Sequence, residues 1–432
     1  MKMDDADLLK SLDQHASGGT GAQPATPSLE CRLMRHLLHT LGDPPIRLTL
    51  WNGESVITGA DHARQIAGGL RIANRATLLR LLIHPNLYFG EAYGSGAIEI
   101  EGDLVALLEA VYRHRRAPST PWSRGLNRLL RWLHHGRGTS LSAARDNIHR
   151  HYDLGNDFYG LWLDRQMSYT CAYFPSRDTT LEQAQIAKMD LICRKLRLRP
   201  GDTVVEAGCG WGALAIHMAQ HYGARVRAFN ISREQIAYAR ARAQVLELDG
   251  RVQFIEDDFR NIKGRFDAFV SVGMLEHVGP GHYDELGRLI DACLARDGRG
   301  LLHSIGQIQP APFNAWIRKR IFPGAYPPTL REMTGILEPQ GFSVLDVENL
   351  RLHYALTLEH WLRRFENARW QVQKMYDEPF VRAWRLYLSG SLAAFNTGQL
   401  QLFQLLFARG ASNNVPWTRA HLYQPLQVKV GP

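Results

Sequence analysis

Three glycines follow a predicted buried strand in the run Glu206-Ala207-Gly208-Cys209-Gly210-Trp211-Gly212. Glycine lets the backbone approach a ligand at positions where a Cβ atom would collide with it. Glu206, at the end of the strand, can accept hydrogen bonds from a cationic or polyhydroxyl group. The run therefore predicts a loop that holds a nucleotide-containing cofactor at the start of a helix.

Two cofactor classes fit this loop. Gly208-x-Gly210-x-x-Ala213 also matches the dinucleotide fingerprint, which requires an acidic residue about 20 positions downstream. The next predicted strand, residues 225–229, ends instead in Asn230, and Glu234 already lies inside the following helix. The tight glycine spacing favours S-adenosylmethionine, which has no pyrophosphate and carries an amino-acid group.

Further polar residues follow other predicted strands. Asp258 can accept a hydrogen bond from an adenine amino group, with Phe259 beside the ring, although an Asp in a loop is commonly a turn former. Glu276 follows the strand at residues 266–272, where burial would raise the pKa of its carboxyl and let it hold or move a proton. His303 lies at the end of another strand. It can donate a hydrogen bond to an anion, act as a base or have a purely structural role.

The predicted elements place these residues at one edge of a sheet. Strand patterns alternate with helix patterns from residue 149 onward, at 203–207, 225–229, 252–255, 266–272 and 300–304. This alternation predicts a doubly wound, Rossmann-like α/β sheet, in which ligands bind beyond the carboxyl ends of the strands. Earlier in the chain, a strand at 46–50, an apolar segment at 77–83 and a helix at 104–108 predict a small α+β domain.

These patterns divide the chain into four parts: a polar, disordered tail at 1–28, the small domain at 29–116, a basic linker at 117–146 and the catalytic domain at 147–432. Within the linker, Trp122 and Leu126 share one helical face, and Arg124 and Arg128 lie on the other. Such a helix can rest on an anionic bilayer or pack as an ordinary linker, and Gly125 weakens it either way.

Composition narrows the function classes. The net charge of +9 favours an anionic partner, either nucleic acid or an anionic lipid surface. The five cysteines lack Cys-x-x-Cys spacing, which argues against a disulfide framework and a zinc site, and we expect no metal. No apolar run approaches the roughly 20 residues of a membrane span, and the N-terminus is no signal peptide, so we expect a cytoplasmic protein.

Several longer motifs are more specific. They are the segments at 151–159 (HYDLGNDFY), 167–174 (MSYTCAYF), 271–279 (SVGMLEHVG) and 303–306 (HSIG), together with the glycine loop. In these segments the chain resembles the cyclopropane fatty acid synthase family, S-adenosylmethionine-dependent lipid methyltransferases related to the mycolic acid methyltransferases. The resemblance spans residues 149 to about 410. The small domain is more loosely similar to that of the longer bacterial members, notably in Gly90-Glu91-Ala92-Tyr93-Gly94.

The resemblance implies two sets of site residues. The set for S-adenosylmethionine is Tyr152, Tyr169, Thr170, Glu206, Gly208, Cys209, Gly210, Gly212, Asn230, Gln235, Asp258 and Phe259. The set for a bound bicarbonate ion, the family's proton acceptor, is Cys171, Glu276, His303, Ile305 and Tyr354. Cys171 and Ile305 would offer backbone N–H groups. The family usually has Thr in place of Asn230, and some members carry a cysteine at the position of Ser391, which we interpret as a wall or core residue.

The implied reaction is methylene transfer to the cis double bond of an unsaturated phospholipid acyl chain, which forms a cyclopropane ring. Methyl-branched or methylene products, another olefinic lipid, or an inactive lipid-binding protein are the alternatives. Nucleic-acid methylation is disfavoured because the chain lacks an Asn/Asp-Pro-Pro-Tyr loop. The resemblance also implies peripheral membrane association, a lipid-binding or docking role for the small domain, and compatibility with a homodimer.

Overall fold

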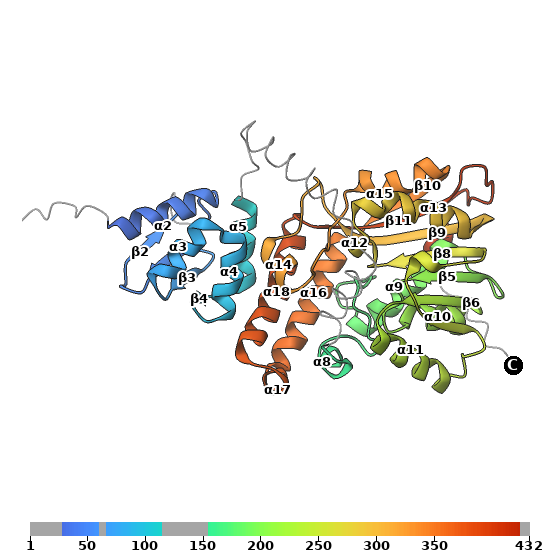
Figure 1. Ribbon diagram of the computed structural model, residues 1–432, viewed down its shortest axis with the longest axis horizontal. Helices are drawn as coiled ribbons and strands as arrows, with labels where there is room; N and C mark the ends of the chain where they lie inside the picture. The colour runs from blue at the N-terminus through green and yellow to red at the C-terminus, as the bar shows by residue number, and fades with distance from the viewer. Residues whose placement is uncertain (1–27, 60–65, 115–153, 424–432) are drawn as a thin grey trace, which may run out of the picture.

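The computed structural model describes residues 28–59, 66–114 and 154–423. Within these ranges the chain forms two units, each with its own sheet (Figure 1). The predicted linker, the N-terminal tail and Tyr152 lie outside the described residues. No helix among those that the structure describes is long and apolar enough to cross a membrane.

The N-terminal unit has a four-stranded sheet in the order β2-β1-β3-β4. Its elements are α2 (Leu29–Thr40), β1 (Arg47–Leu50), β2 (Ser55–Ile57), β3 (Gly69–Ile72), α3 (Arg75–Ile83), α4 (Pro85–Gly94), β4 (Ile98–Glu101) and α5 (Leu104–His114). The predicted strand and helix are confirmed, and the apolar segment at 77–83 forms helix α3, capped by Asn74. Leu48, Ile72 and Leu78 are among the side chains that fill its core.

The C-terminal unit is built on a seven-stranded sheet in the order β10-β11-β9-β8-β5-β6-β7. Its strands are β5 (Thr203–Ala207), β6 (Arg225–Asn230), β7 (Val252–Glu256), β8 (Phe266–Val272), β9 (Leu294–Gly306), β10 (Phe342–Asn349) and β11 (Gln401–Arg409). Strand β11 runs antiparallel to both neighbours, whereas β5 to β9 pair in parallel. The predicted doubly wound α/β fold is therefore confirmed, with an antiparallel strand that the sequence patterns did not indicate.

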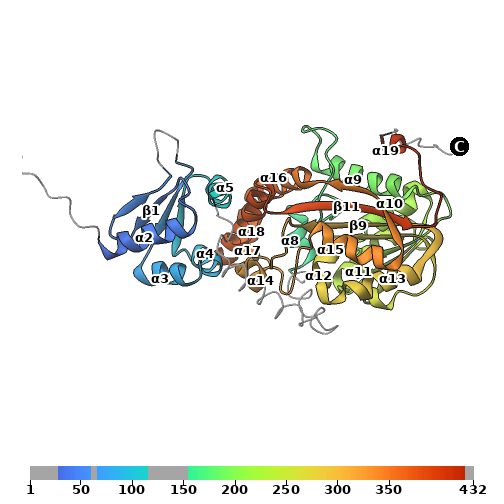
Figure 2. The same ribbon diagram turned by 90° about the horizontal axis from the view of Figure 1, so that it is seen from above.

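Helices cover both faces of this sheet (Figure 2). One face packs against α9 (Leu181–Leu196), α10 (Ala213–Tyr222) and α11 (Arg233–Val245). The other packs against α12 (Leu275–Val278), α13 (Tyr283–Cys293) and α15 (Leu330–Leu337). The remaining α-helices that the structure describes in this unit are α8 (Asn156–Gly160), α14 (Ala315–Arg320), α16 (Arg351–Asn367), α17 (Arg369–Met375), α18 (Glu378–Asn396) and α19 (Ala420–Tyr423).

Helices α14, α16 and α18 lie between the two sheets (Figures 1 and 2). Gly90 on α4 packs against Trp316 on α14, and a Cβ atom at Gly90 would come within 2.5 Å of the Trp316 ring. Glu91 forms ion pairs with Lys319 at 3.3 Å and Arg320 at 2.7 Å. The glycine and the acidic residue of the Gly90–Gly94 motif thus contribute to the contact between the units.

Candidate active site

The glycine loop connects β5 to α10 as predicted. Gly208, Gly210 and Gly212 all have positive φ angles, of 86°, 52° and 82°, which side chains with a Cβ atom rarely adopt. A Cβ atom at Gly210 would meet nothing within 4 Å, whereas one at Gly212 would lie 2.6 Å from Phe254. Gly212 is therefore required for the packing of the loop against β7, and its expected approach to a ligand stays a prediction.

A cavity lies beyond the carboxyl ends of β5, β6 and β8, beside this loop. The residues predicted for the cofactor that line it are Tyr169, Thr170, Glu206, Gly208, Cys209, Gly210, Asn230, Gln235, Asp258 and Phe259. We refer to it below as the cofactor cavity. The sheet therefore brings together residues that are separated by up to 90 positions in the sequence, because parallel strands end at one edge.

Several buried polar atoms of this cavity have no hydrogen-bond partner among the described residues, and Glu206 Oε2 and Gln235 Nε2, a donor, are two of them. Burial raises the pKa of Glu206 to about 8, against the opposing charge of Lys188. Asn230 Nδ2 donates to Gln235 Oε1 at 2.7 Å and to Gly210 O at 3.3 Å, which ties the loop to β6. The unpartnered atoms fit a ligand that has both donors and acceptors, such as the amino-acid group and ribose of S-adenosylmethionine.

Asp258 has an additional partner that the sequence did not indicate. Its two carboxylate oxygens accept from Arg260 Nε at 2.8 Å and Arg260 Nη2 at 3.2 Å. The Arg260 guanidinium also lies 5.4 Å from the centre of the Phe259 ring. Carboxylate oxygens have further lone pairs, so the predicted hydrogen bond to adenine remains available to Asp258.

A second, larger cavity of about 2450 Å³ adjoins the first. The residues predicted for the anion pocket all line it: Cys171, Glu276, His303, Ile305 and Tyr354, with Ser391 on the wall formed by α18. Phe313, Trp316 and Phe322 line it as well, and it extends to apolar side chains of the N-terminal unit such as Leu48 and Ile72. Its size exceeds the roughly 300–1,000 Å³ of ordinary small-molecule pockets.

Glu276 is buried in the wall of this larger cavity. Its Oε1 accepts the backbone N–H of Ile305 at 2.6 Å, and its Oε2 has no partner among the described residues. Burial raises the pKa of the Glu276 carboxyl to about 7. The Ile305 N–H, which the family resemblance assigns to the anion, is donated to Glu276 on α12 in this structure.

The other residues predicted for the anion pocket differ in chemistry. The Cys171 thiol is fully buried and donates to Ala172 O at 3.2 Å, and burial raises its pKa, so it is a poor nucleophile. His303 Nε2 is buried without a partner among the residues described. The ring of Tyr354, on α16, lies 4.6 Å from that of Phe395.

Lys188 is a residue of the cofactor cavity that the sequence analysis missed. It is fully buried on α9, and its Nζ donates to Thr170 Oγ1 at 2.9 Å. Burial lowers the pKa of its ammonium group, which lies near Asp164, Cys171 and Glu206. A lysine on the apolar face of a predicted helix was the signal that could have revealed it.

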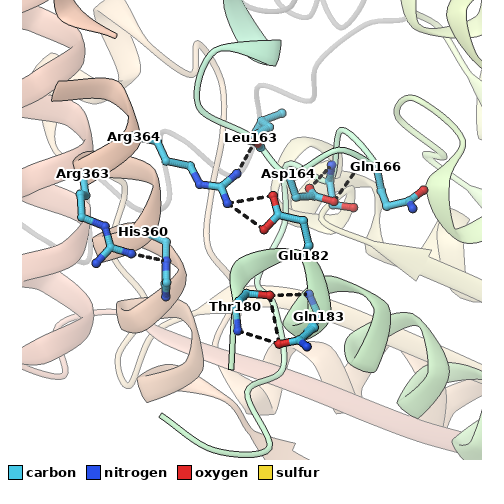
Figure 3. Close-up of polar contacts among 10 residues, drawn as sticks. Leu163, Asp164, Gln166, Thr180, Glu182, Gln183, His360, Arg363 and Arg364 are labelled. Atoms are coloured by element: carbon cyan, nitrogen blue, oxygen red, sulfur yellow. Dashed lines mark hydrogen bonds and ion pairs between the residues drawn. The ribbon is translucent and has the colours of Figure 1, made fainter. Parts of the chain in front are cut away.

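The segment that carries Tyr169 and Thr170 is fixed from both sides. Asp164 accepts hydrogen bonds from the backbone N–H groups of Gln166 at 2.9 Å and Ser168 at 2.8 Å. Arg364, on α16, donates to both carboxylate oxygens of Glu182 and to Leu163 O (Figure 3). Tyr169, Thr170, Gly273 and His277 line both cavities, so this segment forms part of the wall that they share.

The sheet order, the glycine loop at its carboxyl edge and the two adjoining cavities define an S-adenosylmethionine-dependent methyltransferase. A family model described as mycolic acid cyclopropane synthetase matches residues 139–405, and a domain of unknown function (DUF7884) matches residues 33–120. The chain belongs to the mycolic acid cyclopropane synthetase family of lipid methyltransferases.

Individual relatives agree with this assignment. The chain is 34% identical over 398 residues to a probable fatty acid methyltransferase of Pseudomonas putida, covering 88% of this chain and 96% of that one. It is 40% identical over 266 residues to the cyclopropane-fatty-acyl-phospholipid synthase of Escherichia coli K12, covering 61% and 68%. It also resembles the crystal structure of mycolic acid cyclopropane synthase CmaA1 complexed with SAH and CTAB, with a TM-score of 0.58 and 31% identity over 61% of this chain and 97% of that one.

Proposed function

We propose that this protein transfers a methylene group from S-adenosylmethionine to the cis double bond of an unsaturated phospholipid acyl chain, forming a cyclopropane ring with bicarbonate as proton acceptor. One observation carries the proposal: Glu276 Oε2 and His303 Nε2, both buried and without a partner among the described residues, line the same large apolar cavity. An acceptor and a ring nitrogen on the wall of one cavity can together bind a small hydroxylated anion.

The walls of the larger cavity suit an olefin. An alkene is a weak nucleophile, so the protein must hold it in line with the reacting methyl group and exclude water. When bound, S-adenosylmethionine supplies an electrophilic methyl group. Phe313, Trp316 and Phe322 offer aromatic surfaces that can lie beside a developing positive charge without forming a bond to it.

The polar end of the cavity suits proton removal. When bound, bicarbonate supplies the base. In its carboxylate form, Glu276 accepts a hydrogen bond from the hydroxyl group of the anion, while His303 and Tyr354 can donate to its other oxygens. Because the Cys171 side chain is a buried thiol, its expected contribution is its backbone N–H. Placing an anion beside the developing cation stabilises the transition state.

We further propose that the N-terminal unit, with boundaries at 29 and 116, binds lipid or docks the enzyme on its substrate. The support is that apolar side chains of this unit, including Leu37, Leu70 and Leu81, line the same cavity as Glu276. We also propose that the basic segment 117–146 associates peripherally with an anionic membrane from the cytoplasmic side. A homodimer is compatible with this proposal. That segment and the tail at 1–28 lie outside the described residues.

The test is product analysis with the full chain. Purified protein is incubated with S-adenosylmethionine and vesicles of a monounsaturated phospholipid, in carbon-dioxide-free buffer with and without added bicarbonate. We expect acyl chains that gain one CH₂ and lose their double bond, only when bicarbonate is present. Glu276→Gln should retain S-adenosylmethionine binding and lose the product. Bicarbonate-independent product would refute the role of the anion.

A second product has specific support, since the relative with the broadest coverage reported above is a probable fatty acid methyltransferase. In that case the transferred carbon forms the same first bond to the acyl chain, but no ring closes. The product then carries a methylene group or, with an added reductant, a saturated methyl branch. Ozonolysis cleaves the methylene product but neither the ring nor the methyl branch, and mass spectrometry separates these two because the branch has two more hydrogen atoms. If the protein binds S-adenosylmethionine but modifies no lipid, its acceptor is another olefinic lipid. If it does not bind S-adenosylmethionine at all, the result points to a lipid-binding protein without catalytic activity.

A further inference from the structure

A row of polar side chains crosses three neighbouring strands beside the anion pocket. Gln404 on β11 is paired in register with His303 on β9 and with Glu348 on β10. Residues directly opposite each other on adjacent strands point to the same face of a sheet. His303, Gln404 and Glu348 therefore share the face that α9 covers, and Lys195 reaches them from that helix.

Three members of this group are almost completely buried: Lys195 and Gln404 are each 1% exposed and His303 is 2% exposed. Lys195 Nζ lies 2.7 Å from Gln404 Oε1 and 2.5 Å from Glu348 Oε2. Gln404 Nε2 lies 3.0 Å from His303 Nδ1. A buried lysine usually needs such partners, so the carboxylate and the amide oxygen account for its position.

The direction of each hydrogen bond in the row follows from donor chemistry. An ammonium group has only donors, so the atom of Gln404 that faces Lys195 must be the amide oxygen. The amide NH₂ then faces His303, and because NH₂ also only donates, His303 Nδ1 must be the acceptor. A neutral imidazole that accepts at Nδ1 carries its proton on Nε2.

His303 Nε2 points away from this row and has no hydrogen-bond partner among the described residues, although it is buried and the ring lines the larger cavity. Burial, together with the positive charges of Lys188 and Lys195, holds the pKa of His303 well below its usual value. The ring is therefore neutral, and its single N–H is the one that can face a ligand.

We propose that Lys195 and Gln404 are positioning residues that hold His303 in the Nε2–H tautomer, so that the ring presents a hydrogen-bond donor to the anion of the active site. This inference rests on the proposed function for the identity of the anion, but not for the tautomer. In the opposite tautomer, Nδ1–H would face the amide NH₂, donor against donor, and the Nε2 lone pair would face the anion. Lys195 thus acts on the pocket through two hydrogen bonds, without touching the lipid.

The sharpest variant is Gln404→Glu, which has nearly the same shape. Its carboxylate can still accept from Lys195, but the oxygen that replaces Nε2 can only accept, so His303 Nδ1 must become protonated. The matched control is Gln401→Glu on the same strand, whose amide bonds Asn349 and Gly398 O instead of His303. Both variants add a carboxylate to β11, and only the first reverses the donor at His303.

The first measurement is ¹⁵N NMR of the full-length protein labelled at histidine, with His303→Asn used to assign the resonance. Protonated and unprotonated ring nitrogens resonate in separate ranges. We expect an unprotonated Nδ1 and a protonated Nε2 in the wild type and in Gln401→Glu, and a protonated Nδ1 in Gln404→Glu. A protonated Nδ1 in the wild type, or an unprotonated Nδ1 in Gln404→Glu, overturns the inference.

The second measurement is turnover against bicarbonate concentration at saturating S-adenosylmethionine. A lost hydrogen bond to a charged group corresponds to a roughly ten- to hundred-fold rise in the bicarbonate concentration for half-maximal rate in Gln404→Glu, with Gln401→Glu close to wild type. An unchanged bicarbonate dependence in Gln404→Glu, when its ¹⁵N spectrum shows an unprotonated Nε2, would show that the anion does not use the His303 N–H. If the wild type needs no bicarbonate, the proposed function fails, while the NMR result still decides the tautomer.

Discussion

The raised pKa of Glu276 makes the stability of the protein depend on pH in a way that one substitution removes. The carboxyl has a pKa of about 7 in the folded chain, against an ordinary value of 4.5, because it is buried. Between these two pH values the unfolded chain has released the proton and the folded chain has kept it. Folding stability must therefore fall as pH rises through this window and level off above about pH 7.

The size of the effect follows from the shift. Each pKa unit corresponds to about 1.36 kcal/mol, so the full penalty at high pH is about 3 kcal/mol. Between pH 5 and pH 8 the wild type should lose about 2 to 3 kcal/mol from this group. Glu276→Gln cannot ionise and lacks this loss. Other buried groups, including Glu206 with its pKa of about 8, titrate in both proteins and cancel in the comparison.

The assay is urea denaturation of wild type and Glu276→Gln at a series of pH values without ligands. The quantity of interest is the difference in unfolding free energy between the two proteins at each pH. Replacing Oε2 by an amide nitrogen adds a constant offset of about 1–3 kcal/mol, because the buried NH₂ lacks an acceptor. The slope with pH remains diagnostic: we expect the variant to gain about 2 to 3 kcal/mol relative to wild type from pH 5 to pH 8. A difference that stays flat over this range would refute a raised pKa for Glu276.

Three further predictions concern glycines, with Gly160→Ala as the control because a Cβ atom there meets nothing within 4 Å. Gly210→Ala should weaken S-adenosylmethionine binding in calorimetry, because its Cβ enters open space in the cofactor cavity, and should cost only about 1–2 kcal/mol of stability for the left-handed backbone. Gly212→Ala should affect stability more than cofactor binding. Overpacking and backbone strain should lower its stability by about 2–4 kcal/mol, measured by thermal unfolding. Gly90→Ala should cost about 1–3 kcal/mol by displacing Trp316, and an unfolding curve equal to that of the control would contradict the proposed packing between the units.

Much of the cofactor cavity could be predicted because its signals are local. Two signals can be recognised within short stretches of sequence. They are the spacing of Gly208 and Gly210, and the acidic or amide side chains that directly follow strands. Parallel strands then place those residues at one edge without further information, as they do for Asn230 and Asp258. The packing constraint on Gly212 could not be predicted in this way, because it comes from Phe254 on another strand.

The sequence by itself determined the doubly wound sheet and the cofactor loop, since periodicity and motif spacing are properties of neighbouring residues, whereas the residues of the predicted anion pocket were implied only by the family resemblance. Only the tertiary structure decided which partners these residues have. The antiparallel insertion of β11 sets Gln404 against His303, 101 residues earlier, and α9 brings Lys195 to the same amide across 209 residues. Such pairs form because the interior excludes water, so each buried polar group must find its partner within the fold, at any distance along the chain.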